Sequence, residues 1–206
     1  MVELGCEPLA ATVLEDDRAV VIRPLGEAEH AALLAFGAAL PQDDLLYLED
    51  DFQNSDIITR LINACFAENW RQIVAMAGDA IIGYSAVRRL PGWSNHVADI
   101  ILLIDEHWRR SGLGTALAQA IFDAARNLGV NKVIVEMLEE QQAGRAIFER
   151  LGFRVEGTLS AHACDRHGQC RNLLILAYHV SESSRQESVA SSASAYTTRV
   201  SRYVPH

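Results

Sequence analysis

The segment from Asp99 to Thr115 constrains the fold of this chain most, because it predicts a strand, a glycine-containing turn and a helix in immediate succession. Its first part, Asp99–Ile104, is an apolar run that is typical of a buried strand. The turn that follows contains two arginines and two closely spaced glycines, at Arg109, Arg110, Gly112 and Gly114. Glycine lets a ligand approach the backbone, the first helical turn offers unpaired N–H groups to anions, and arginine donates forked hydrogen bonds to phosphate. The segment therefore predicts a phosphate-binding site.

Two common phosphate-binding motifs do not fit this turn. The dinucleotide fingerprint Gly-x-Gly-x-x-Gly/Ala fails because Leu117 stands at its third position. The P-loop fails because no Lys-Ser/Thr pair follows the second glycine. The run Arg109–Gly114 instead resembles motif A of the GNAT superfamily of N-acetyltransferases, Gln/Arg-x-x-Gly-x-Gly/Ala. Taken alone, this run also fits an ordinary strand–turn–helix connection.

The residues after motif A continue the resemblance in the order of the family. A helix with an apolar stripe of 3.6-residue period ends at Gly129, and a short apolar strand follows at Lys132–Glu136. The run Gln141–Phe153 is similar to the family's motif B, Asn-x-x-Ala-x-x-x-Tyr-x-x-x-Gly-Phe. The last two strands are expected at Arg154–Ala161 and Cys170–His179, with a turn at 165–168. On these motifs the chain is identified as a member of the GNAT superfamily over residues 18–180.

The resemblance implies an α/β (α+β) fold, the GNAT fold, with a mixed central sheet of about seven strands, about four helices and splayed central parallel strands. In the first half of the chain, the pattern predicts strands at Arg18–Pro24, Gln72–Ala77 and Ala80–Arg89 and helices at Ala28–Leu40 and Ser55–Asn69. Residues 1–17 can add an edge strand. We expect one acetyltransferase domain over residues 1–180. The Ser-rich residues 181–206 have few large apolar side chains and predict a disordered tail.

Composition excludes several other classes of protein. The net charge of −9 argues against a general nucleic-acid binder. No apolar run reaches the ~20 residues of a membrane span, and the first residues lack the basic start of a signal peptide. The four cysteines, Cys6, Cys65, Cys164 and Cys170, lack the spacing of a disulfide framework. We therefore expect a cytoplasmic protein with reduced thiols that binds neither nucleic acid nor membrane.

The resemblance also implies the reaction, which is direct attack of a neutral amine on the thioester of acetyl-CoA, the cosubstrate. The family uses backbone N–H groups of the motif A loop for the pyrophosphate and a backbone N–H of the preceding strand for the oxyanion. The cofactor-binding residues implied here are Leu102, Leu103 and Ile104 on the strand, Arg109, Arg110, Ser111, Gly112, Leu113, Gly114 and Thr115 in the loop, and Gln141 and Phe148 in motif B.

Two carboxylates compete for the role of general base. Asp99 matches the strand glutamate of histone-type family members, and Glu136 matches a glutamate of ribosomal-protein N-terminal acetyltransferases. A carboxylate in an apolar strand is costly to bury unless it is paired or functional. Each of these residues stands at the end of its strand, so each also fits a solvated strand end.

Motif B departs from the family pattern at the residue expected to protonate the leaving thiolate. Phe148 stands at the position of the usual tyrosine, Gln141 replaces the asparagine and Gly144 replaces the alanine. Tyr178 or Tyr84 could supply the acid from a neighbouring strand, although strand tyrosines are commonly core residues. Catalysis without an acid is also feasible, because a thiol of pKa ~8.5 leaves readily as its anion.

The acidic segment 41–52, which includes Asp50 and Asp51, suits a cationic amine such as a polyamine, an aminoglycoside-like sugar or a lysine side chain, or is a solvated acidic face. A second cluster, His162, Cys164, His167 and Cys170, suggests zinc. We expect Cys164 to pair with Gln169 across the hairpin, which places Cys170 on the opposite face and leaves no metal site.

The sequence thus predicts an acetyl-CoA-dependent N-acetyltransferase that acts on a primary amine, in particular on a small cationic molecule. A protein lysine or N-terminal acetyltransferase is one alternative. A catalytically weak acyl-CoA-binding module is the other, and Phe148 is the residue that favours it. A homodimer is compatible with the resemblance, because family members often associate through their terminal strands.

Overall fold

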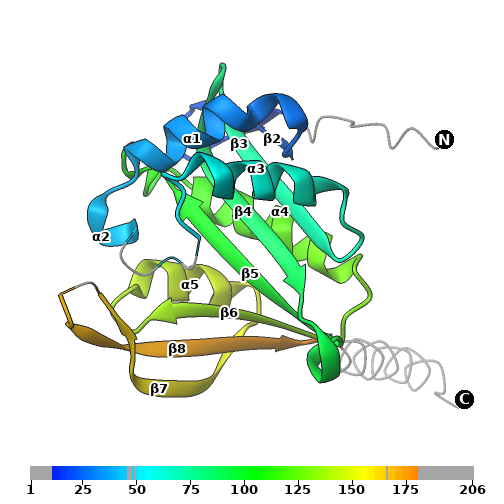
Figure 1. Ribbon diagram of the computed structural model, residues 1–206, viewed down its shortest axis with the longest axis vertical. Helices are drawn as coiled ribbons and strands as arrows, with labels where there is room; N and C mark the ends of the chain where they lie inside the picture. The colour runs from blue at the N-terminus through cyan, green and yellow to red at the C-terminus, as the bar shows by residue number, and fades with distance from the viewer. Residues whose placement is uncertain (1–10, 46–47, 49, 166, 181–206) are drawn as a thin grey trace, which may run out of the picture.

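The computed structural model describes residues 11–45, 48, 50–165 and 167–180. These residues form one eight-stranded sheet in the order β1-β2-β3-β4-β5-β6-β8-β7 (Figure 1). The strands are β1 (Ala11–Val13), β2 (Ala19–Pro24), β3 (Trp70–Ala77), β4 (Ala80–Arg89), β5 (Val97–Ile104), β6 (Lys132–Leu138), β7 (Arg154–Cys164) and β8 (Cys170–His179). The α-helices are α1 (His30–Ala39), α2 (Gln42–Leu45), α3 (Ser55–Asn63), α4 (Leu113–Arg126) and α5 (Gln142–Arg150).

The predicted class, an α/β fold with a mixed central sheet, is confirmed, and the described residues contain eight strands and five α-helices where about seven strands and about four helices were expected. The β5–β6 pair is parallel, and the other neighbouring pairs are antiparallel. The expected edge strand is β1. The helix predicted at Ser55–Asn69 is shorter, because α3 ends at Asn63 and a 3-10 turn follows. The acidic segment contains a helix, α2, that the sequence pattern did not indicate.

Two apolar clusters lie on the two faces of the sheet. On one face, α4 and α5 cover residues such as Ile100, Val133 and Val135. On the other face, α1 and α3 cover residues such as Val74 and Tyr84 (Figure 1). Because successive side chains of a strand point to opposite faces, these two clusters assign a face to every residue of β5 and β6.

The two parallel strands separate after a short paired stretch. Residues Val97–Ile100 of β5 pair with Lys132–Val135 of β6, and both strands continue beyond this stretch without pairing to each other. The expected splay is therefore confirmed. We call the opening between Ile101–Ile104 and Glu136–Leu138 the β5–β6 gap. The chain leaves β5 beside the gap and enters α4. The predicted phosphate loop, which joins β5 to α4, therefore lies at one end of the gap.

The hairpin of β7 and β8 corrects two expectations. Cys164 lies opposite Cys170 rather than Gln169, with a Cα–Cα distance of 4.0 Å, and the two cysteines form a disulfide. The expectation of reduced thiols was therefore wrong for this pair, and so was the assignment of Cys170 to the opposite face. The cause is the loop between the strands. The carboxylate of Asp165 accepts hydrogen bonds from the N–H groups of His167 and Gln169, which makes Gln169 part of the loop.

Among the described residues, no group of three or more His, Cys, Asp and Glu side chains is placed to hold a metal ion. In the same part of the chain, no helix has both the length and the apolar character that crossing a bilayer requires. The predicted disordered tail, residues 181–206, lies outside the described residues.

Candidate functional site

The loop between β5 and α4 is held by its own side chains. The Asp105 carboxylate accepts the N–H of His107 (2.8 Å), and the buried Ser111 hydroxyl donates to the carbonyl of Trp108 (2.6 Å). Arg110 and Gly112 have positive φ angles of 62° and 87°. These left-handed residues turn the chain sharply into α4.

The first turn of α4 leaves backbone donors for an anion. The N–H of Leu113 donates to the Ser111 hydroxyl. The first hydrogen bond of the helix runs from the N–H of Ala116 to the carbonyl of Gly112. By helix geometry, the N–H groups of Gly114 and Thr115 have no carbonyl of α4 to bind. A Cβ on Gly114 would lie 3.0 Å from Cδ1 of Ile147, so a side chain here would require Ile147 of α5 to shift. The loop therefore combines donors, a helix dipole and nearby arginines.

The turn between β1 and β2 lies against this loop, a contact that the sequence analysis missed. The N–H of Glu15 donates to the Ser111 carbonyl (3.0 Å), and a Cβ on Gly112 would lie 3.0 Å from Cγ of Glu15. The guanidinium of Arg18 lies 3.8 Å from the centre of the Trp108 ring. Glu15 thus brings a negative charge close to the predicted anion site. No local sequence signal indicates this contact, because it joins distant segments.

Two hydrogen bonds show which backbone groups of β5 face the gap. The N–H of Asp105 donates to the carbonyl of Ile82, and the carbonyl of Val97 accepts the N–H of Leu90, so odd-numbered residues of β5 face β4. Because backbone groups alternate along a strand, Leu102 and Ile104 direct their N–H groups toward the gap. Leu103 faces β4, and its side chain is buried in the cluster under α1 and α3. Of the three predicted oxyanion residues, Leu102 and Ile104 have the required orientation.

The two candidate bases share one face of the sheet. Asp99 and Glu136 both lie on the face that α1 and α3 partly cover, as the alternation with Ile100 and Val135 on the other face requires. Asp99 lies opposite Arg88 of β4. Along β5 it precedes Leu102 by three residues, a distance of about 10 Å. Glu136 is exposed and directly follows Val135, the last residue of β6 that pairs with β5, so it stands at the gap. The structure therefore favours Glu136 by position.

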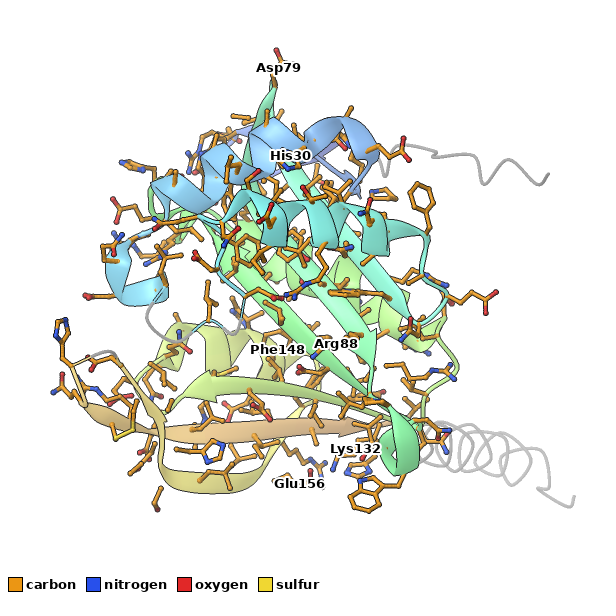
Figure 2. All side chains as sticks on the ribbon, viewed as in Figure 1. His30, Asp79, Arg88, Lys132, Phe148 and Glu156 are labelled. Carbon is orange, nitrogen blue, oxygen red and sulfur yellow. A yellow bond between two sulfur atoms is a disulfide. The ribbon has the colours of Figure 1, made fainter. Side chains whose placement is uncertain are left out.

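The aromatic candidates are packed into the two apolar clusters of the sheet. The Tyr178 ring packs 4.7 Å from the Phe122 ring on the opposite face from both carboxylates. Tyr84 is 1% exposed, and its hydroxyl donates to Oε1 of Gln72 (2.6 Å), while burial raises its pKa well above the ordinary value. Phe148 is also buried, and its ring centre lies 5.3 Å from that of Phe153. In the view of Figure 2, Phe148 lies between β5 and β6. The structure does not bring these rings together with the carboxylates.

Two other predicted site residues have partners within the protein. Oε1 of Gln141 accepts the N–H of Leu138 (2.9 Å), which closes the turn between β6 and α5. The guanidinium of Arg109 forms an ion pair with Asp44 of α2. In the same acidic segment, Asp50 forms an ion pair with Arg60 of α3 (2.5 Å). Arginines of the protein therefore neutralise part of the acidic segment.

Comparison with known proteins agrees with this geometry. The family model described as "Acetyltransferase (GNAT) family" matches residues 41–153, more than half of the chain. The L-amino acid N-acetyltransferase AaaT of Escherichia coli K12 is 26% identical over 102 residues, which are 48% of this chain and 62% of that protein. N-alpha-acetyltransferase 30 of Schizosaccharomyces pombe is 28% identical over 105 residues, which are 48% of this chain and 69% of that protein. The chain thus matches about two thirds or less of the length of these relatives.

Solved structures share the fold. A GNAT-family acetyltransferase from Streptococcus pneumoniae superposes with a TM-score of 0.70 at 18% identity, over 78% of this chain and 99% of that chain. An acetyltransferase structure from Salmonella typhimurium, solved with its cofactor acetyl-CoA, superposes with a TM-score of 0.69 at 16% identity, over 78% of this chain and 94% of that chain.

Proposed function

Because this chain belongs to the acetyltransferase (GNAT) family, we propose that it transfers an acetyl group from acetyl-CoA to a primary amine. The observation that carries the proposal is the β5–β6 gap, with the N–H of Leu102 facing it and the phosphate loop at its end. Attack on a thioester needs a hydrogen-bond donor for the oxyanion, and a phosphate-bearing cofactor needs an anion site. The Leu102 N–H and the loop before α4 are candidates for these two tasks, and they lie at the same gap.

Each proposed residue has one task in the reaction. The N–H groups of Gly114 and Thr115, flanked by the exposed Arg110, bind the pyrophosphate. The N–H of Leu102 binds the thioester oxygen as the amine nitrogen attacks the carbonyl carbon. Glu136 accepts the proton that the amine loses, directly or through water. The C–S bond then breaks and CoA leaves as its thiolate, without an acid from motif B.

For the acceptor, we propose a small cationic molecule with a primary amine. Glu136 places an exposed carboxylate beside the gap, and this charge attracts a cation. The names of the two relatives, an L-amino acid N-acetyltransferase and an N-alpha-acetyltransferase, favour an α-amino group as the acceptor. A protein N-terminus is therefore the alternative acceptor. The Cys164–Cys170 disulfide removes the reduced-thiol argument for the cytoplasm, so we propose no location.

The test is release of CoA thiol from acetyl-CoA with a panel of amino acids, polyamines and peptides with free N-termini. We expect turnover with at least one amine and its loss in Glu136→Gln. No release with any amine, in folded protein that binds acetyl-CoA, favours the second candidate, an acyl-CoA-binding module. Phe148 supports that candidate because it has no hydroxyl at the position of the family's usual acid, and the hydroxyl of the buried Tyr84 already donates to Gln72.

A further inference from the structure

Arg109 opens the motif A loop, yet its guanidinium is directed to protein groups. Nη2 forms an ion pair with the carboxylate of Asp44 and also donates to the carbonyl of Ile104 (3.4 Å). Ile104 ends β5 on the gap side, and Asp44 belongs to α2. One guanidinium therefore joins the phosphate loop, the end of β5 and the segment that connects α1 to α3.

The later part of that segment is attached to the α1 and α3 side of the molecule. A Cβ on Gly37 of α1 would lie 2.1 Å from the carbonyl oxygen of Phe52, so the two backbones are in direct contact. Phe52 is buried against the Tyr84 ring (5.1 Å between centres), and Asp50 is paired with Arg60. The Asp44–Arg109 pair instead attaches α2 to the gap. Figure 1 shows α2 beside the end of the sheet where β5 terminates.

We propose that Arg109 is a positioning residue for the acceptor, which holds α2 at the mouth of the β5–β6 gap through Asp44, and that Arg110 supplies the arginine charge for the cofactor phosphates. This inference deepens the proposed function and rests on it. It follows from the contacts because Nη2 of Arg109 binds both the Asp44 carboxylate and the Ile104 carbonyl, which ties α2 to the end of β5. Arg110 is exposed at the entrance to α4.

The closing experiment compares Arg109→Gln, Asp44→Asn and their combination with the matched control Arg110→Gln. Acceptor KM and the Kd for acetyl-CoA are measured for each variant, with melting temperatures to confirm folding. We expect Arg109→Gln and Asp44→Asn each to raise acceptor KM by about 3–5-fold, the range of a half-exposed ion pair. The double variant should match either single variant, because both remove one interaction. The Kd for acetyl-CoA should stay within about twofold in these variants and rise in Arg110→Gln.

A second readout does not depend on activity. Hydrogen exchange of the backbone amides of Gln42–Leu45, without any ligand, should accelerate in Arg109→Gln and Asp44→Asn and stay unchanged in Arg110→Gln. Unchanged exchange in all variants would overturn the inference. A raised acetyl-CoA Kd in Arg109→Gln with unchanged acceptor KM would also overturn it, because Arg109 would then be a phosphate ligand. If the wild-type protein neither binds acetyl-CoA nor releases CoA, the proposed function fails, while hydrogen exchange still tests the contact between Arg109 and α2.

Discussion

Substitution of Gly112 by alanine separates two reasons why glycine is needed in the phosphate loop. Its φ angle of +87° is unfavourable for a side chain, at a cost of about 1–2 kcal/mol. In addition, the new Cβ would lie 3.0 Å from Cγ and 3.2 Å from Cδ of Glu15, which must then move. We add about 0.5–1 kcal/mol for this shift, by analogy with mild overpacking. The total expected loss of unfolding free energy is about 1.5–3 kcal/mol.

Gly78→Ala is the matched control for the backbone contribution. Gly78 has a φ angle of +59°, and nothing lies within 4 Å of its added Cβ, so only the strain of the backbone is measured there. Urea unfolding should show that Gly112→Ala is more destabilising than Gly78→Ala. In a Glu15→Ala background the difference should shrink, because the colliding atoms are absent. Equal losses for both glycines, or no relief from Glu15→Ala, would refute the proposed contact between the β1–β2 turn and the loop.

Three further predictions concern single side chains. Glu136→Gln should lower kcat by about 10²–10⁴-fold, measured by CoA release, and should leave the Kd for acetyl-CoA unchanged in a titration. A smaller loss of kcat in Glu136→Gln than in Asp99→Asn would contradict the choice of base. Glu15→Gln should tighten acetyl-CoA binding severalfold at low salt and much less at high salt, because it removes a negative charge beside the anion site; weaker binding would instead indicate that this carboxylate contacts the ligand. Tyr84→Phe should cost about 1–3 kcal/mol in urea unfolding, because Oε1 of the buried Gln72 loses its partner, while turnover stays unchanged if Tyr84 is structural.

The local part of the site could be predicted from the sequence. The apolar run of β5, the turn with Gly112 and Gly114 and the helix α4 are encoded in adjacent residues, and their order alone indicates the phosphate loop. The alternation of β5 and β6 then assigns Asp99 and Glu136 to one face as soon as the register is known. Register itself could not be predicted, because it depends on which strands pair and where they separate.

The contacts that join distant segments left no signal in the sequence pattern. Asp44 meets Arg109, and Glu15 meets Gly112, only because the sheet brings their elements together. The disulfide was missed for a related reason. The spacing of Cys164 and Cys170 fits several hairpin registers, and the hydrogen bonds of Asp165 to the loop select the one that places them opposite each other.

The most direct test of the central claim, that the β5–β6 gap and the loop before α4 bind acetyl-CoA, is a thermal-shift titration of the purified protein with acetyl-CoA, CoA and NAD. At about 100-fold over its Kd, acetyl-CoA should stabilise the protein by about 2.7 kcal/mol, which corresponds to an increase in Tm of about 5–10 °C for a chain of this size. NAD should give no shift, because the dinucleotide fingerprint is absent. No shift with acetyl-CoA or CoA, in a folded sample, would contradict the claim.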